Sequence, residues 1–165
     1  MFHDPSYFPF TAELEMNRES IHREFLAIRH RLVDWVEKDL YDEGWQVFGL
    51  YDFPHGKPIP SQTESCPFTA GLVSRLLPRH GAVGFSLLKP HCHIKSHSGY
   101  QGHFLRCHLP LIVPEGDCAL RVLRETRPWK LGTPVVFDDR VEHEAWNHTS
   151  APRVVLLLDF LPYNG

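Results

Sequence analysis

Short apolar or alternating runs recur through the second half of the chain, and this pattern limits the fold more than any other feature. Turn-forming residues separate the runs. They cover residues 82–89, 91–97, 103–113, 118–123, 133–137 and 153–160. Several short strands at such intervals predict a sandwich or a barrel. We therefore expect a mainly β fold, a double-stranded β-helix or jelly-roll, with its core in residues 81–165.

The first 80 residues have a different periodicity, and we expect them to form a helical part that packs on the barrel. One stripe of apolar residues has the spacing of a helix: Ile21, Phe25, Ile28, Leu32 and Trp35. This stripe predicts one long helix that begins at Thr11 and ends near residues 42–44. A second helix is expected from Pro67 to Leu77, and a short strand over residues 45–51.

Length and charge limit the class of protein. A chain of 165 residues is expected to form one domain, residues 1–165, with a single core. The net charge is −3 and the basic residues are scattered, so no nucleic-acid partner is expected. The sequence shows no apolar run of membrane-spanning length and no secretory leader. We expect a cytoplasmic protein with reduced cysteines, and the oligomeric state is left open.

Titratable side chains gather in residues 86–108, which contain five of the twelve histidines. Because alternate residues of a strand share a face, His91, His93, Lys95 and His97 are expected on one side of a strand. Phe104, Arg106 and His108 are expected to share a face of the next strand. Such polar faces predict a functional site.

A metal site is one interpretation of two distant histidines, His97 and His143. Non-haem Fe(II) oxygenases use two histidines and a carboxylate that stands two residues after the first histidine. Here that position is Gly99, so taken alone the pattern also fits a turn glycine with polar strand histidines. Asp138 and Asp139 are candidates for the missing ligand, although a role in shaping the turn is favoured.

Arg153 strengthens the oxygenase interpretation. It opens an apolar strand ten residues after His143, and a buried arginine needs an anionic partner. The far carboxylate of a two-oxoacid cosubstrate needs such a cation. Ser86, on the strand that leads toward His97, is a candidate for a second hydrogen bond to the same carboxylate.

These stretches resemble the aspartyl/asparaginyl β-hydroxylase family of Fe(II)- and 2-oxoglutarate-dependent oxygenases, whose fold is cupin-like. The similar segments cover nearly the whole chain in order: DPSYFPFTAELEMNRESIHREF, CPFT, FSLLKPHCHIKSHSG, LRCHLPLIVP, ETRPWKLGTPVVFDD, EHEAWN and PRVVLLLDF. The resemblance implies hydroxylation with Fe(II), O2 and 2-oxoglutarate, which is converted to succinate and CO2.

The resemblance also implies roles for individual residues. His97 and His143 would be the only protein ligands of iron, with water or another small ligand beside Gly99. Arg153 and Ser86 would hold the far carboxylate of 2-oxoglutarate. His108 and Arg106 would lie near its iron-bound end.

The substrate is left open by the sequence. The vertebrate type has a substrate-binding arginine where this chain has Phe104, which disfavours an acidic substrate group. His91 and His93 are candidates for substrate contacts, although supporting hydrogen bonds are the favoured role. We expect a small molecule, a free or carrier-bound amino acid, a lipid acyl chain or, less readily, a peptide.

Two other functions remain open. A 2-oxoglutarate-dependent halogenase also has a small residue in place of the carboxylate, because chloride needs that space. A cupin-like module could bind a metal or ligand without turnover, although Arg153 and Ser86 would then have no purpose.

Overall fold

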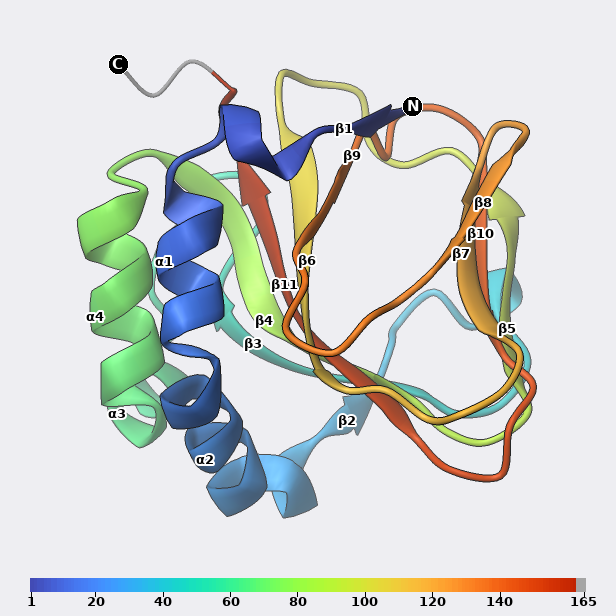
Figure 1. The fold of residues 1–165 in the computed structure, drawn as a ribbon. Helices are drawn as coiled ribbons and strands as arrows, with labels where there is room; N and C mark the ends of the chain where they lie inside the picture. Colours follow the sequence, from blue (N-terminus) through green and yellow to red (C-terminus); the bar gives the residue numbers. More distant parts are fainter. Residues whose placement is uncertain (163–165) are drawn as a thin grey trace.

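Two antiparallel sheets face each other in the computed structural model, which describes residues 1–162, and helices cover the outer face of the larger sheet (Figure 1). The larger sheet has seven strands in the order β1 (Phe2–His3), β9 (Val135–Phe137), β6 (Leu105–Ile112), β11 (Arg153–Phe160), β4 (His80–Leu88), β3 (Trp45–Tyr51) and β2 (Val33–Asp34). The smaller sheet has four strands in the order β5 (Cys92–His97), β10 (His143–Asn147), β7 (Cys118–Val122) and β8 (Glu125–Pro128). The expected mainly β fold with N-terminal helices is confirmed.

The helical layer comes from two separate parts of the chain. The α-helices are α1 (Phe10–Met16), α2 (Arg18–Ile28), α3 (Pro60–Ser65) and α4 (Pro67–Leu76), and 3-10 turns cover Pro5–Tyr7, Arg29–Arg31 and Lys38–Leu40. Apolar residues of α1, α2 and α4 pack against one face of the larger sheet and form the first core. Among residues 1–162, none of the helices has both the length and the apolar character needed to cross a bilayer.

The single long helix expected from Thr11 to residues 42–44 is wrong. The chain breaks at Asn17, between α1 and α2, and the second helix ends at Ile28. Val33 pairs instead with Val47 as part of the large sheet, and the Trp35 ring stacks on Trp45. Tertiary pairing therefore overrides the helical spacing of the last apolar positions. The helix expected from Pro67 is confirmed to within one residue.

The sheet also uses strands from the first 80 residues. β1, β2 and β3 all pair into it, so this part of the chain contributes to the sandwich as well as to its helical cover. The division into residues 1–80 and 81–165 stays a prediction of how the domain is organised.

Strand alternation fills the space between the sheets with both apolar and polar residues. On β6 and β11, the residues Leu105, Cys107, Leu156 and Leu158 face the helices. The residues between them face the smaller sheet, and several are polar or charged yet nearly inaccessible to solvent. They include His108, Arg153 and Asp159, and Ser86 of β4 and His143 of β10 are also buried. A buried polar group is costly unless it has a partner, so this interior is the place to look for a site.

Candidate metal and cosubstrate site

Two histidines on neighbouring strands form the centre of the candidate site. His97 ends β5 and His143 begins β10, the two are register partners, and their ring centroids lie 4.3 Å apart. Each Nδ1 atom bonds to the backbone carbonyl two residues earlier, that of Lys95 at 2.7 Å and that of Val141 at 2.8 Å. A carbonyl only accepts, so each Nδ1 carries a proton, and in the neutral ring Nε2 then keeps a lone pair. This is the state in which imidazole binds a metal ion.

Burial keeps the second of these rings uncharged. His143 is buried, and desolvation lowers its pKa to about 4, with a further lowering from the neighbouring His97. The ring is therefore neutral near pH 7 and available as a ligand. Both histidines line one small cavity between the sheets.

A β-bulge in β5 turns His97 toward the interior. Between the pairs Ile94 with Ala145 and His97 with His143, β5 has two residues where β10 has one. The extra residue shifts the alternation, so that His97 lies on the inner side with Ile94. The expectation that His91, His93, Lys95 and His97 share one side of a strand is therefore wrong.

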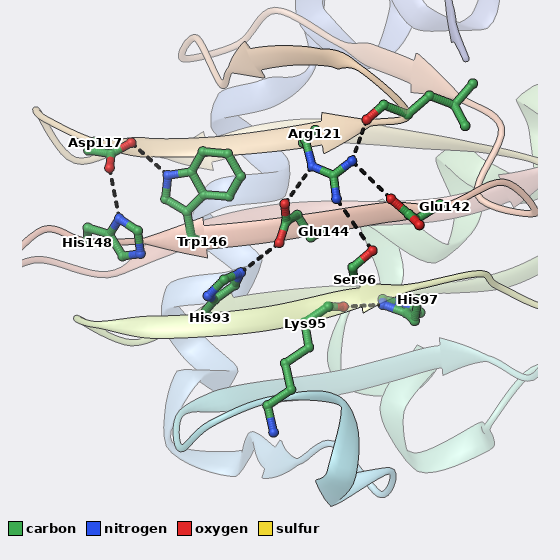
Figure 2. A network of polar contacts seen from close by, with 11 residues as sticks. His93, Lys95, Ser96, His97, Asp117, Arg121, Glu142, Glu144, Trp146 and His148 are labelled. Atoms are coloured by element: carbon green, nitrogen blue, oxygen red, sulfur yellow. Dashed lines mark hydrogen bonds and ion pairs between the residues drawn. The ribbon is translucent and has the colours of Figure 1, made fainter.

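His93 lies on the outer face of the smaller sheet, in a polar network (Figure 2). Its Nε2 atom is 3.0 Å from Oε2 of Glu144, and Oε1 of Glu144 accepts a bond of 2.5 Å from Arg121. The ring of Trp146 packs near His93 on the same face. His91 is an exposed turn residue with φ of 62°. The structure places neither His91 nor His93 at the candidate site.

A buried guanidinium lines the same small cavity as the two histidines. Arg153 is 1% exposed, and within residues 1–162 its Nε and Nη1 atoms have no hydrogen-bond partner. Its Cζ atom lies 4.6 Å from the centroid of the Trp129 ring, and desolvation lowers its pKa to about 10. A buried cation of this kind calls for a bound anion. Arg153 lines a cavity of about 40 Å³ together with both histidines.

Two further hydrogen-bond donors line the same cavity. The Ser86 hydroxyl oxygen accepts a bond of 3.1 Å from Nε1 of Trp45, which leaves its own hydrogen free to donate. Nδ1 of His108 accepts a bond of 3.3 Å from Nε1 of Trp129, so its Nε2 carries the hydrogen, and no partner for Nε2 lies in the described part of the chain. Burial and the charge of Arg153 hold the pKa of His108 well below its usual value. One cation and two neutral donors match the donor set that a dicarboxylate needs, so the residues fit 2-oxoglutarate.

Sequence reasoning did not assign Trp45 and Trp129 to the site, although each holds one of its polar groups. Trp129 is a buried core residue and also packs against Arg153. No local pattern in the sequence predicts these contacts, because each joins segments at least 21 residues apart.

Arg106 has partners within the protein, unlike Arg153. Its Nε and Nη2 donate to the two carboxylate oxygens of Asp159 at 2.7 and 3.0 Å, and its Nη1 lies 3.1 Å from Oδ2 of Asp139. It lines the site, but two carboxylates offset its charge. The expected role of Arg106 at the iron-bound end of the cosubstrate stays a prediction.

Gly99 is required because Asp139 fills the space beside it. A Cβ atom at position 99 would lie 2.6 Å from Oδ2 and 2.7 Å from the carbonyl oxygen of Asp139, which already accepts a bond from the Gly99 amide. Position 99 therefore has no room for a ligand side chain. Desolvation raises the pKa of Asp139. In the described range no group of three or more His, Cys, Asp or Glu residues could hold a metal ion.

A second and larger cavity, of about 320 Å³, adjoins the first. The two share Trp45, Ser86, His97, Arg106 and Leu157. Phe104 lines neither of them. Its ring lies against Gly81 and 6.1 Å from the centroid of Phe53, which does line the larger cavity.

Comparison with known proteins gives the family. A family profile described as Aspartyl/Asparaginyl beta-hydroxylase matches residues 15–162 of the chain. The chain belongs to the aspartyl/asparaginyl β-hydroxylase family. Its relatives include the ornithine lipid ester-linked acyl 2-hydroxylase of Rhizobium tropici, 34% identical over 96% of this chain and 59% of that protein. The mouse aspartyl/asparaginyl β-hydroxylase is 28% identical over 94% of this chain and 22% of its own length.

The chain thus spans between about a fifth and three fifths of these two relatives. Solved structures confirm the fold of this family member. An oxidoreductase of the 2OG-Fe(II) oxygenase family from Burkholderia pseudomallei has a TM-score of 0.64 at 13% identity, over 96% of this chain and 91% of that one. A prolyl-4-hydroxylase from Pseudomonas putida has a TM-score of 0.57 at 15% identity, over 87% and 86% of the two chains. The expected jelly-roll is confirmed.

Proposed function

We propose that this chain is an Fe(II)- and 2-oxoglutarate-dependent hydroxylase that releases succinate and CO2. The observation that carries the proposal is the unpaired, buried guanidinium of Arg153 in a cavity lined by two histidines whose Nε2 lone pairs are free. One histidine pair alone would fit many metal proteins. The anion-binding group beside it is what a 2-oxoglutarate enzyme needs.

The residues divide the work between metal and cosubstrate. His97 and His143 would hold iron, which supplies dioxygen activation coupled to oxidative decarboxylation of 2-oxoglutarate when bound. Arg153 and Ser86 bind the far carboxylate of the cosubstrate. The Nε2 hydrogen of His108 donates to its other end, and the apolar walls around these groups exclude water.

Asp139 supports hydroxylation over halogenation. A halogenase needs an open position for chloride beside the small residue. Here a carboxylate oxygen of Asp139 would lie 2.6 Å from a Cβ at Gly99, so the space is filled by a group that repels an anion. The relatives' names include both amino acid and lipid acyl hydroxylases, so the comparisons leave the substrate open.

Succinate formation tests the proposal. The full chain, loaded with Fe(II) and 2-oxoglutarate without oxygen and then exposed to oxygen, is expected to form succinate, and substrate should accelerate it. His97→Ala and His143→Ala should each abolish succinate formation. A brominated product in the presence of bromide would favour the halogenase, and absence of metal-dependent succinate would favour a non-catalytic binding module.

A further inference from the structure

The larger cavity is mostly apolar and has the size of a medium-length hydrocarbon chain. Its walls include Trp35, Leu40, Val47, Phe53, Val83 and Leu157. A dry apolar cavity of about 150 Å³ holds benzene, which has six carbons. By the same proportion the cavity of about 320 Å³ holds a ligand of roughly twelve carbons. Apolar walls stabilise such a ligand by removing its surface from water.

A strip of bare backbone crosses the floor of this cavity. Leu157 of β11 is the register partner of Gly84 in β4, and Gly84 is in turn the partner of Gly49 in β3. A Cβ at Gly84 would lie 2.7 Å from the carbonyl oxygen of Phe48 and 3.0 Å from the Cα of Gly49. Close packing of the two strands therefore leaves no room for a side chain at Gly84, and a Cβ at Gly49 would lie 3.3 Å from Cδ1 of Ile59. The strip begins beside Leu157, which also lines the cosubstrate cavity, and it fits an extended row of methylenes.

The charges around the cavity disfavour an acidic substrate. Arg106 is the one Lys or Arg among its described lining residues, and Asp159 and Asp139 already hold it. Glu37 adds a third carboxylate to the lining. An aspartyl side chain or a free fatty acid carboxylate would therefore meet an excess of negative charge.

We propose that this cavity binds an unbranched acyl chain, presented as a neutral ester or amide, and that Ala82 sets the chain length accepted. Ala82 lines the cavity on the same side of β4 as Gly84 and Ser86, next to the strip. The proposal rests on the proposed function, because the acyl chain is the hydroxylase's substrate.

Binding of N-acyl ethanolamines with chains of four to twelve carbons tests the proposal. Calorimetry on the full chain, with and without Fe(II) and 2-oxoglutarate under nitrogen, is expected to show Kd falling about fourfold per added methylene until the cavity is full. Ala82→Leu adds three carbons to the wall, so its Kd should stop falling about three carbons earlier. Ala27→Leu, the same change on the exposed side of α2, is the matched control and should behave as the parent chain.

Two results would overturn the acyl assignment: a Kd that does not depend on chain length, or an identical length profile for Ala82→Leu and the parent. Succinate formation stimulated by an aspartyl or asparaginyl peptide but by no acyl compound would also overturn it, while leaving the hydroxylase intact. Length-dependent binding without succinate formation would support the acyl cavity and overturn the hydroxylase. The experiments can therefore contradict the acyl-chain cavity without contradicting the hydroxylase, and the reverse.

Discussion

At the scale of single residues, two buried arginines of the site differ in whether the protein itself neutralises their charge. Arg153 and Arg106 differ in how their charges are paired. Within residues 1–162, Nε and Nη1 of the buried Arg153 have no hydrogen-bond partner, whereas Arg106 is held by Asp159 and Asp139. An unpaired buried charge destabilises the ligand-free protein, while a paired one is compensated. In the proposed function, the same charge therefore serves cosubstrate binding at position 153 and structure at position 106.

Replacement of Arg153 by an apolar side chain should separate stability from binding. Arg153→Met is expected to stabilise the cosubstrate-free protein by about 1–4 kcal/mol, because it removes an uncompensated buried charge. Addition of 2-oxoglutarate should then no longer raise Tm, and KM for 2-oxoglutarate should rise about 100-fold or more.

Thermal unfolding with and without 2-oxoglutarate measures both effects, and iron binding should persist in the variant. Ser150→Met, at an exposed turn position, is the control for the added side chain. A cosubstrate-free Arg153→Met protein that is less stable than its parent, yet still stabilised by 2-oxoglutarate, would contradict the assignment.

At the scale of secondary-structure elements, irregular backbone places the functional groups. The bulge in β5 directs His97 inward. The turn between β10 and β11 brings Arg153 to its position and is held by Asn147. This fully buried side chain donates to the carbonyls of Leu88 at 3.1 Å, Lys89 at 3.2 Å and Ala151 at 2.8 Å.

Removal of two residues from the bulge should remove a metal ligand without removing the fold. Deletion of both Lys95 and Ser96 places His97 directly after the inward-facing Ile94, opposite Glu144, and so turns it to the outer face. Metal affinity should fall at least about 100-fold, since even residues that only orient ligands account for 10–100-fold. Equilibrium dialysis with Mn(II) or Fe(II) measures this. Ser96→Ala, which keeps the length of β5, should bind metal as the parent does, and equal loss in both variants would contradict the role of the bulge.

Loss of the Asn147 side chain should loosen the junction of β4, β10 and β11. Asn147→Ala is expected to lower the free energy of unfolding by about 2–4 kcal/mol, because several buried carbonyls and the Thr149 groups lose their partner. Urea denaturation measures the loss. Asn17→Ala, whose side chain makes one bond to the Glu13 carbonyl, should cost less than about 1.5 kcal/mol. Similar losses at the two positions would show that the junction does not depend on Asn147.

At the scale of the whole molecule, the two cores bury all four cysteines. Burial raises the pKa of the Cys66 thiol to about 12 and those of Cys92 and Cys118 to about 11, and it raises the pKa of Cys107 as well. The ordinary value is 9.0. The folded protein therefore keeps these thiols protonated at a pH where the unfolded chain ionises them.

Stability should consequently fall as the pH rises above 9. The folded-state pKa of each thiol is raised above that of the unfolded chain. The contribution of each thiol to the free energy of unfolding is therefore complete below pH 9 and is lost as the pH rises toward 11 to 12. Each thiol adds up to about 1.4 kcal/mol of destabilisation per pH unit in that range. Urea midpoints between pH 8 and 10.5 measure the slope. Cys92→Ala should make the slope shallower, and an unchanged slope would assign the alkaline loss to other groups.

Periodicity and spacing were enough to predict much of this family member. Alternating runs predicted most strands of the sandwich, because a half-buried strand must alternate. His97, His143 and Arg153 were predicted as a group, and the fold does bring all three to one cavity. Position 99 was predicted to lack a ligand, which is visible in the sequence because glycine has no side chain.

Only the tertiary structure decided how these residues are oriented and paired. The bulge that turns His97 inward depends on the register with β10, and register is a property of two strands rather than of one. Arg106 and Asp159 are 53 residues apart, so no local pattern could show that they neutralise each other. Phe104 lies just before β6 and packs on Gly81, outside both cavities. Alternation is a local consequence of backbone geometry, whereas partners and cavities arise from contacts between distant segments, which no single stretch of sequence contains.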